Sequence, residues 1–320
     1  MTPTLLREIL AEARFSPSVH NVQPTRWRLQ PDGEVLVLDA PDRRLAVGDP
    51  TGRDALASHG AAVEGFAIAA SVRGFTVRLS PAEDAVTKLM LSPGASPDPL
   101  ASFLQTRRTY RGPFREGEGA AELATLAATC GDLLLVDDAD GIAAVARLND
   151  VASLRTFRRR PFRLELLSWM RLSPRHPDWG RDGLNAEAMS LSPAEAIGAG
   201  VALRPGVFEV LDRLGLAGPI TGEADVVRSA AALAVFAAAA DEPPFETGRR
   251  WHRAWLEIAR AGLSAAPMTV LGDDPEAAAE VARIAGVPDG ARVVTVFRLG
   301  VPAGPLPEPA RLPVEELIAP

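Results

Sequence analysis

The chain has 320 residues and a formal net charge of −7, with 47% hydrophobic and 23% charged residues. These values are typical of a globular protein large enough for about two domain-sized units. The acidic balance argues against a nucleic-acid-binding surface, and no apolar run is long enough to span a membrane. The single cysteine, Cys130, rules out an internal disulfide framework and favours a reducing compartment. We therefore expect a cytoplasmic protein without nucleic-acid or membrane partners.

Apolar residues recur at helical spacing over residues 4–14, so we expect an amphipathic helix there rather than a signal peptide. Pro31-Asp32-Gly33 predicts the turn of a hairpin with strands over 27–29 and 35–38. The next helix, 53–72, is apolar on all sides in its middle, which is typical of a buried helix. The same patterns predict helices over 141–157, 248–262 and 274–285, and strands over 75–79, 133–136, 230–238 and 293–299.

Two segments lack a regular pattern. Residues 80–102 are rich in Pro, Ser and Asp, and we expect them to connect two halves of the chain. Residues 161–225 are dense in Pro and Gly and include Trp169 and Trp179. A long irregular segment in a compact enzyme is often a lid or a binding loop. It can equally be a surface excursion packed by its own aromatic residues.

Two further groups of residues are expected to be structural. The arginines of the run 155–160 are those of a solvated basic helix end. Trp251 and Trp255 are four residues apart and therefore share one helix face, which is expected to belong to the core.

The loop from Pro17 to Pro24 is unusually polar. Pro17 ends the preceding helix, because the residue before a proline disfavours the α region. The loop then presents four short hydrogen-bonding side chains: Ser18, His20, Asn21 and Gln23. Such a loop can hold a polar ring system, and it can also simply turn a corner.

Pro17-Ser18-x-x-Asn21-x-Gln23-Pro24 resembles the flavin-binding loop of the nitroreductase family. Four further stretches agree, in an order similar to that of the Acg-like branch, which holds two incomplete nitroreductase-like halves in one chain. They are Arg107-Arg108-Thr109-Tyr110-Arg111, residues 262–270, residues 293–302 and Arg311-Leu312-Pro313. The resemblance implies an α+β nitroreductase-like fold, with a central mixed β-sheet flanked by helices.

The same resemblance implies an intrachain pseudo-dimer, with one half over residues 1–100 and the other over 101–320. The lid would be the segment 161–225. An internal similarity supports this division: residues 59–79 and 251–271 are both expected to run from a helix through a glycine into an apolar segment. One chain would then supply both sides of an interface.

The resemblance also implies an FMN site. The expected cofactor-binding residues are Pro17, Ser18, His20, Asn21, Gln23, Arg107, Arg108, Thr109, Arg111, Pro267, Met268, Thr269 and Arg311. The arginines would bind the phosphate, since a guanidinium matches its geometry, and the amides would meet the pyrimidine edge of the flavin. Arg111 would stabilise charge near N1 and O2 of the reduced ring. His20 is expected to touch flavin or substrate.

Because a flavin carries the hydride chemistry itself, no catalytic side chain and no metal are required. The implied function is a ping-pong oxidoreductase that passes hydride from NAD(P)H to FMN, and then to a nitro, quinone or similar acceptor. Two alternatives stay open, a weakly active FMN-binding or storage protein and a flavin-free scaffold. In each case the partners would be small molecules, and the chain would be a monomer (the pseudo-dimer) or a homodimer.

Two positions depart from the family pattern. Thr25 stands where the family has a tryptophan, and Val19 stands where it has a second serine. These changes remove an aromatic wall and a polar contact, so they bear on substrate fit and flavin affinity.

Overall fold

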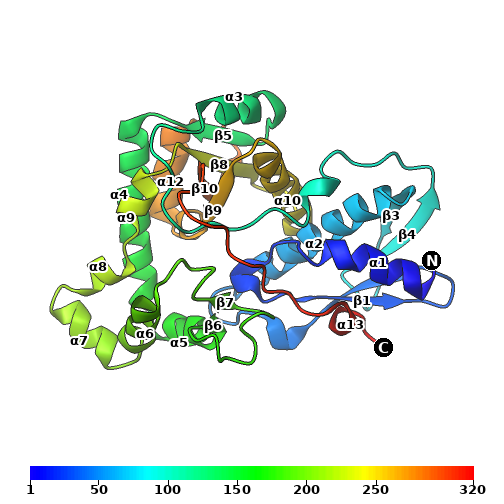
Figure 1. Cartoon of the computed structure of the whole chain (residues 1–320), viewed down its shortest axis with the longest axis horizontal. Coiled ribbons are helices and arrows are strands. Elements are labelled where there is room, and N and C mark those ends of the chain that lie inside the picture. The colour runs from blue at the N-terminus through cyan, green and yellow to red at the C-terminus, as the bar shows by residue number, and fades with distance from the viewer.

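The first hundred residues fold as a helix, a hairpin, a long helix and a second hairpin (Figure 1). The computed structural model describes residues 1–320. Thr2 caps the first helix by accepting a hydrogen bond from the amide of Leu5 at 3.2 Å, and Pro3 occupies its first turn. The elements are α1 (Pro3–Ala13), β1 (Thr25–Leu29), β2 (Val35–Asp39), α2 (Arg53–Ser71), β3 (Phe75–Ser80) and β4 (Thr87–Pro93). Short 3₁₀ turns cover Val19–Asn21, Pro41–Arg43 and Ala101–Phe103.

The strand β4 corrects the expectation that residues 80–102 are a plain connector. It lies between β2 and β3 in an antiparallel sheet of order β1-β2-β4-β3. This strand was not predicted because its apolar residues Leu89, Met90 and Leu91 are consecutive rather than alternating with polar residues. Leu89 is fully buried against α1 and α2 residues of the first core.

The rest of the chain builds a second antiparallel sheet, of order β5-β8-β10-β9. Its strands are β5 (Leu133–Val136), β8 (Ala232–Ala239), β9 (Ser264–Met268) and β10 (Ala291–Gly300). The flanking helices are α3 (Ala120–Thr129), α4 (Ala139–Phe157), α10 (Pro244–Arg260), α11 (Val270–Asp273) and α12 (Pro275–Ala285). Most residues of the central strands β8 and β10 are buried, since both faces of this sheet carry a core. Residues 264–268, within the stretch 262–270 that the resemblance includes, form an edge strand.

The expected α+β class is confirmed. The single central mixed sheet is replaced by two antiparallel sheets. In the first, β1–β2 and β3–β4 are joined by short turns, which dictate antiparallel pairing. Parallel pairing occurs only at sheet edges, where Trp27 meets Ile318 and Thr109 meets Ala265, and in a separate two-stranded ribbon. That ribbon consists of β6 (Met170–Arg171) and β7 (Leu184–Asn185).

The two units meet along α2 and α10, which pack against each other in the middle of the molecule (Figure 1). Two glycines allow the backbones to touch. A Cβ atom at Gly60 of α2 would lie 1.9 Å from the carbonyl oxygen of Phe245, and one at Gly248 of α10 would lie 1.9 Å from that of Ala57. Each helix thus places a glycine against the other. This reciprocity agrees with a pseudo-dimer, which stays a prediction.

The segment after α4 contains mainly short helices: α5 (Arg160–Trp169), α6 (Pro193–Ala202), α7 (Val207–Arg213), α8 (Ala217–Thr221) and α9 (Ala224–Arg228). Leu203, Phe208 and Ala217 form a small core of their own beneath α6, α7 and α8, which project at one corner in Figure 1. The tail returns across the molecule and ends in α13 (Val314–Leu317). No helix of the chain is both long enough and apolar enough to cross a membrane.

Candidate functional site

A cavity of about 200 Å³ lies between the two units and is lined by 27 residues. The first unit contributes the loop 17–21 and the first turns of α2. The second contributes residues 107–111, the tryptophans of α10, the end of β9, part of β10 and the tail over 307–311. All the predicted cofactor-binding residues line this cavity except Gln23 and Met268. The fold therefore brings residues from far apart in the sequence to one place.

The loop 17–24 has an unusual backbone. His20, Asn21 and Gln23 have φ angles of 44°, 55° and 52°, in the left-handed region that residues other than glycine rarely adopt. Such conformations cost free energy and persist only where the surroundings hold them. Ser18 supplies part of that support, because its hydroxyl accepts a hydrogen bond from the amide of Gln23 at 3.0 Å.

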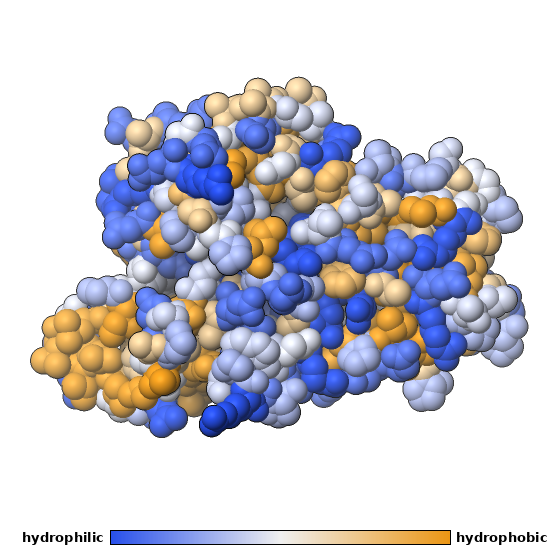
Figure 2. All heavy atoms as spheres, viewed as in Figure 1, coloured by the Kyte–Doolittle hydropathy of each residue, from blue (hydrophilic) through white to orange (hydrophobic).

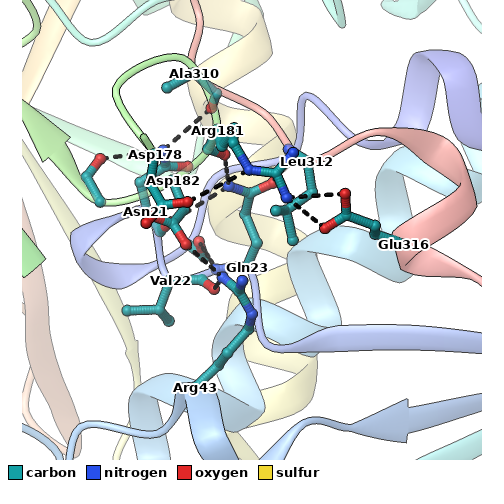
Figure 3. Close-up of polar contacts among 12 residues, drawn as sticks. Asn21, Val22, Gln23, Arg43, Asp178, Arg181, Asp182, Ala310, Leu312 and Glu316 are labelled. Carbon is teal, nitrogen blue, oxygen red and sulfur yellow. Dashed lines mark hydrogen bonds and ion pairs between the residues drawn. The ribbon is translucent and has the colours of Figure 1, made fainter. Parts of the chain in front are cut away.

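The side chain of Asn21 supplies more of the support (Figure 3). Its Nδ2 donates to the carbonyl oxygens of Gly183 at 3.2 Å and Ala310 at 3.1 Å, and its Oδ1 accepts from Arg311 at 2.8 Å. Both amide protons of Asn21 are therefore used within the protein. Asn21 lines the cavity, but its role here is to tie the loop to two distant segments.

Gln23 makes the same kind of connection. Its Nε2 donates to the carbonyl oxygen of Arg181 at 2.8 Å, and its Oε1 accepts from the amide of Leu312 at 2.9 Å (Figure 3). The expected contact of this amide with a flavin edge is not supported, because the side chain is buried and lies outside the cavity lining. Met268 is likewise absent from the lining, since its side chain packs into the core of the second unit.

Arg107 and Arg311 form the most charged part of the wall. Arg107 is 4% exposed, donates to the carbonyl oxygen of Phe15 at 2.9 Å, and stacks with its guanidinium 4.3 Å from the ring centre of Trp255. Arg311 donates to the same oxygen at 3.1 Å. Neither forms an ion pair with a carboxylate, and the Nε atoms of both are buried without a hydrogen-bond partner.

Burial lowers the pKa of both arginines. The pKa of Arg311 falls to about 10, mainly by burial and then by repulsion from Arg108 and Arg14. That of Arg107 falls well below its usual value, again mainly by burial and then by repulsion from Arg311 and Arg108. Buried cations without partners are costly, and an anion between them would remove that cost. The wall has the donor set of an anion site.

Arg108 and Arg111 line the cavity beside this pair. Arg108 donates to the carbonyl oxygens of Gln105 at 2.5 Å and Arg107 at 3.0 Å. Arg111 donates to the carbonyl oxygen of Ala188 at 2.9 Å. Burial lowers the pKa of both.

His20 lies at another part of the lining. Burial, and then the charge of Arg111, lowers its pKa to about 4, so the imidazole is neutral near pH 7. Its Nδ1 is buried without a partner, and its ring meets the edge of Phe162 with centres 6.4 Å apart. A neutral imidazole can both donate and accept a hydrogen bond.

Several residues of the lining were not predicted from the sequence. Trp251 and Trp255 pack on Phe297 as expected of core residues, yet both also face the cavity. The indole nitrogens of Trp251 and Trp255 and the hydroxyl of Thr295 are buried without partners, so three further donors are available there. Trp255 had a sequence signal, since aromatic residues often wall cofactor sites, but Thr295 lies inside an ordinary strand pattern.

Asp54, in the first turn of α2, is another lining residue without a sequence signal. Burial raises its pKa to about 6, with further repulsion from Asp273 and Asp49. Asp54 and Asp273 line both this cavity and a neighbouring one, as do His20 and Thr269. From sequence, Asp54 was one acidic residue among many at a helix start.

The segment 161–225 also reaches the site. Gly183, Leu184 and Ala188 line the cavity. Asp182, just before them, is buried between Arg171 and Arg43, with its carboxylate 2.8 and 3.0 Å from the two guanidinium groups. This anchor fixes the segment against the first unit.

Sequence comparison finds relatives for part of the chain. The protein named "Putative NAD(P)H nitroreductase Rv3131" from Mycobacterium tuberculosis strain H37Rv is 30% identical over 162 residues, which are 46% of this chain and 47% of that protein. "Putative NAD(P)H nitroreductase acg" from the same strain is 34% identical over 79 residues, 25% of this chain and 24% of that protein. The chain thus spans less than half the length of the relatives that it matches. No family model matches it.

Solved structures give distant matches. A nitroreductase with bound FMN from Bacteroides fragilis NCTC 9343 has 15% identity and a TM-score of 0.38, covering 65% of this chain and 91% of that one. Iodotyrosine deiodinase bound to FMN and 3-iodo-L-tyrosine has 15% identity and a TM-score of 0.38, covering 66% of this chain and 94% of that one. Part of this chain is thus similar to proteins named as NAD(P)H nitroreductases, acg among them.

Proposed function

We propose that this chain binds FMN in the cavity between its two units and acts as an NAD(P)H-dependent oxidoreductase of the nitroreductase type. One observation carries the proposal. Arg107 and Arg311 are held together in the cavity wall without a carboxylate partner. A phosphate group supplies the negative charge and the acceptor oxygens that two such guanidinium groups require. The relatives, named as NAD(P)H nitroreductases, support the same reading.

The remaining wall fits the rest of an FMN molecule. Arg107, Arg311 and the hydroxyl of Thr109 would hold the phosphate, with Arg108 beside them. The unpartnered donors of Trp255 and Thr295 offer hydrogen bonds to polar atoms of the cofactor. Pro17, Ser18, Pro267 and Thr269 line the same cavity and would complete its walls. When bound, FMN supplies hydride transfer, so the protein need not provide a nucleophile.

The chain's own groups then bind, orient and shield. Asn21 and Gln23 hold the loop 17–24 in its left-handed conformation, and Asn21 also lines the cavity. The guanidinium group of Arg111 lies near His20 in the cavity wall. A cation or hydrogen-bond donor beside the flavin ring would stabilise the negative charge of the reduced flavin. Asp54 keeps a proton on its carboxyl group up to about pH 6 at the boundary of the two neighbouring cavities.

The second candidate is an FMN-binding protein of low activity whose lid covers the flavin. The observation that favours it is the contribution of Gly183, Leu184 and Ala188 to the cavity wall. Under either reading the chain is a cytoplasmic protein acting on small molecules. The single cysteine is consistent with that location, because it is buried and cannot pair within the chain.

The absorbance spectrum of the purified protein, before and after adding FMN, tests the cofactor. We expect flavin bands and about one FMN released per chain on heating, because one cavity holds the arginine pair. A preparation that stays colourless with added FMN would refute the proposal. Anaerobic addition of NADPH then separates the two candidates. Bleaching of the flavin band followed by reoxidation with a quinone indicates the oxidoreductase, and a flavin that is not reduced indicates the binding protein.

A further inference from the structure

One corner of the molecule has an apolar surface that its fold does not explain. Among the large hydrophobic residues that are exposed, a majority fall within residues 197–220. They are Ile197, Val201, Val207, Val210, Leu214, Leu216 and Ile220. Figure 2 shows a continuous hydrophobic area at the corner that α6, α7 and α8 form in Figure 1. We name these seven residues the α6–α8 patch.

The helices beneath the patch already have a buried side. Leu203, Phe208 and Ala217 face inward and pack on residues of α4 and α5. The patch residues are on the outward side, where Ile197 is 70% and Leu214 is 67% exposed. Helices that are apolar on both sides are normally covered on both sides. The outward side therefore needs a cover that the single chain does not supply.

The charged residues of this corner leave the patch almost uncharged. Glu209 pairs with Arg163, and Asp212 pairs with Arg158, so both carboxylates are satisfied by arginines of the underlying helices. Arg204 and Arg213 are the two charged residues of 197–220 that form no ion pair. Whatever covers the patch must therefore be mainly apolar.

The size of the patch fits a protein interface. The exposed fractions correspond to roughly 600 Å² of apolar surface, as much as the largest patch on a typical monomer. A stable interface buries about 800 Å² on each partner, and in homodimers roughly 65% of it is apolar. The α6–α8 patch alone is therefore large enough to form the apolar part of such an interface.

We propose that the α6–α8 patch binds the same patch of a second copy of this chain, giving a homodimer. A twofold contact brings identical surfaces together, so an apolar patch finds an apolar partner without needing complementary charge. A lipid surface is disfavoured, because membrane-binding surfaces of this kind carry clusters of basic residues. Residues 197–220 contain only two unpaired arginines, Arg204 and Arg213. The proposal is independent of the flavin.

Sedimentation velocity of the full chain over a concentration series tests the proposal. We expect a dimer that dissociates on dilution. The double variant Val210→Glu/Leu214→Glu should weaken the dimer by about tenfold or more, because it buries charge at the centre of the contact. Val72→Glu is the matched control: Val72 is 47% exposed at the end of α2, outside the patch, and its replacement should leave the dimer intact.

Circular dichroism confirms that each variant is folded, and Val210→Ser/Leu214→Ser replaces the glutamate pair if that pair does not fold. A wild-type chain that remains monomeric at all concentrations would overturn the proposal. So would a dimer that the patch variants do not weaken. Wild-type monomer that co-sediments with phosphatidylglycerol vesicles, but not with phosphatidylcholine vesicles, would assign the patch to a membrane surface instead.

Discussion

Arg107 and Arg311 donate hydrogen bonds to the same backbone oxygen, that of Phe15, at 2.9 and 3.1 Å. One arginine follows the first unit and the other lies in the C-terminal tail, yet their guanidinium groups share an acceptor at the end of α1. The charge of Arg311 lowers the pKa of Arg107 in addition to the effect of burial. Stacking on Trp255 and hydrogen bonds to backbone oxygens hold them in place without neutralising them.

This arrangement predicts the effect of removing either arginine. Arg107→Ala and Arg311→Ala should each weaken FMN binding by about 10- to 150-fold, since a hydrogen bond to a charged group contributes about 1.5–3 kcal/mol. Titration of the flavin-free protein with FMN, followed by fluorescence, measures the change. Arg158→Ala is the control, because Arg158 is 57% exposed and pairs with Asp212 away from the cavity. Equal losses for Arg158→Ala and Arg311→Ala would refute the phosphate assignment.

The raised pKa of Asp54 predicts that the free energy of unfolding depends on pH. Its pKa is raised to about 6 in the folded chain from an ordinary value of 3.8. Between these values the folded chain retains a proton that the unfolded chain releases, so the free energy of unfolding falls as the pH rises from about 4 to about 6. Asp54→Asn removes this penalty and should stabilise the protein by about 1–2 kcal/mol at pH 7.5, with little effect near pH 4.

Urea denaturation at both pH values measures this difference. Asp289→Asn serves as control, because Asp289 is exposed in the turn before β10 and makes no side-chain hydrogen bond or ion pair. Its stability should follow that of the wild type at both pH values. A gain for Asp54→Asn that is the same at pH 4 as at pH 7.5 would mean that the titration of Asp54 is not responsible.

The close approach at Gly248 predicts how strongly the stability of the protein depends on the contact between α2 and α10. A Cβ atom there would lie 1.9 Å from the carbonyl oxygen of Ala57, so Gly248→Ala must push α2 and α10 apart. We expect the free energy of unfolding to fall by about 3 kcal/mol. FMN binding should weaken as well, because Ala57 lines the cavity. Gly131→Ala, which meets no atom within 4 Å, should change stability by less than about 0.5 kcal/mol. Similar losses in the two variants would contradict the close packing.

The ion pairs of Asp182 predict that its replacement will loosen the segment 161–225, the expected lid. Replacing it with Asn leaves the buried guanidinium of Arg171 without a charged partner, which should cost about 3 kcal/mol. Limited proteolysis should then cut faster within residues 172–192. If the segment gates the flavin, reduction by NADPH in stopped flow should also be faster. Asp178→Asn, at a surface pair with Arg181 in which both side chains are 39% exposed, is the matched control. Faster cleavage with an unchanged reduction rate would show that the segment does not gate the site.

Short-range patterns in the sequence predicted most of the longer elements of both units, but not α3, β4 or β9. Helical spacing of apolar residues predicted α1, α2, α4, α10 and α12, and turn residues predicted the β1–β2 hairpin, because these signals depend on neighbours within about one or two turns. β4 was not predicted, for the same reason. Its place between β2 and β3 depends on partners elsewhere in the chain, and its own residues do not alternate.

The motifs also located the site, since most of the residues that they named line one cavity. Only the tertiary structure decided what each polar group does there. The amides of Asn21 and Gln23 are occupied by carbonyl and amide groups 158 to 289 residues away, whereas Arg107 and Arg311 keep unpartnered nitrogen atoms. Asp54 and Arg158 are ordinary charges in the sequence, but the side chain of Asp54 is 27% exposed and lies near other carboxylates, whereas that of Arg158 is 57% exposed. Burial and hydrogen-bond partners depend on which distant segments meet, and a local pattern does not contain that information.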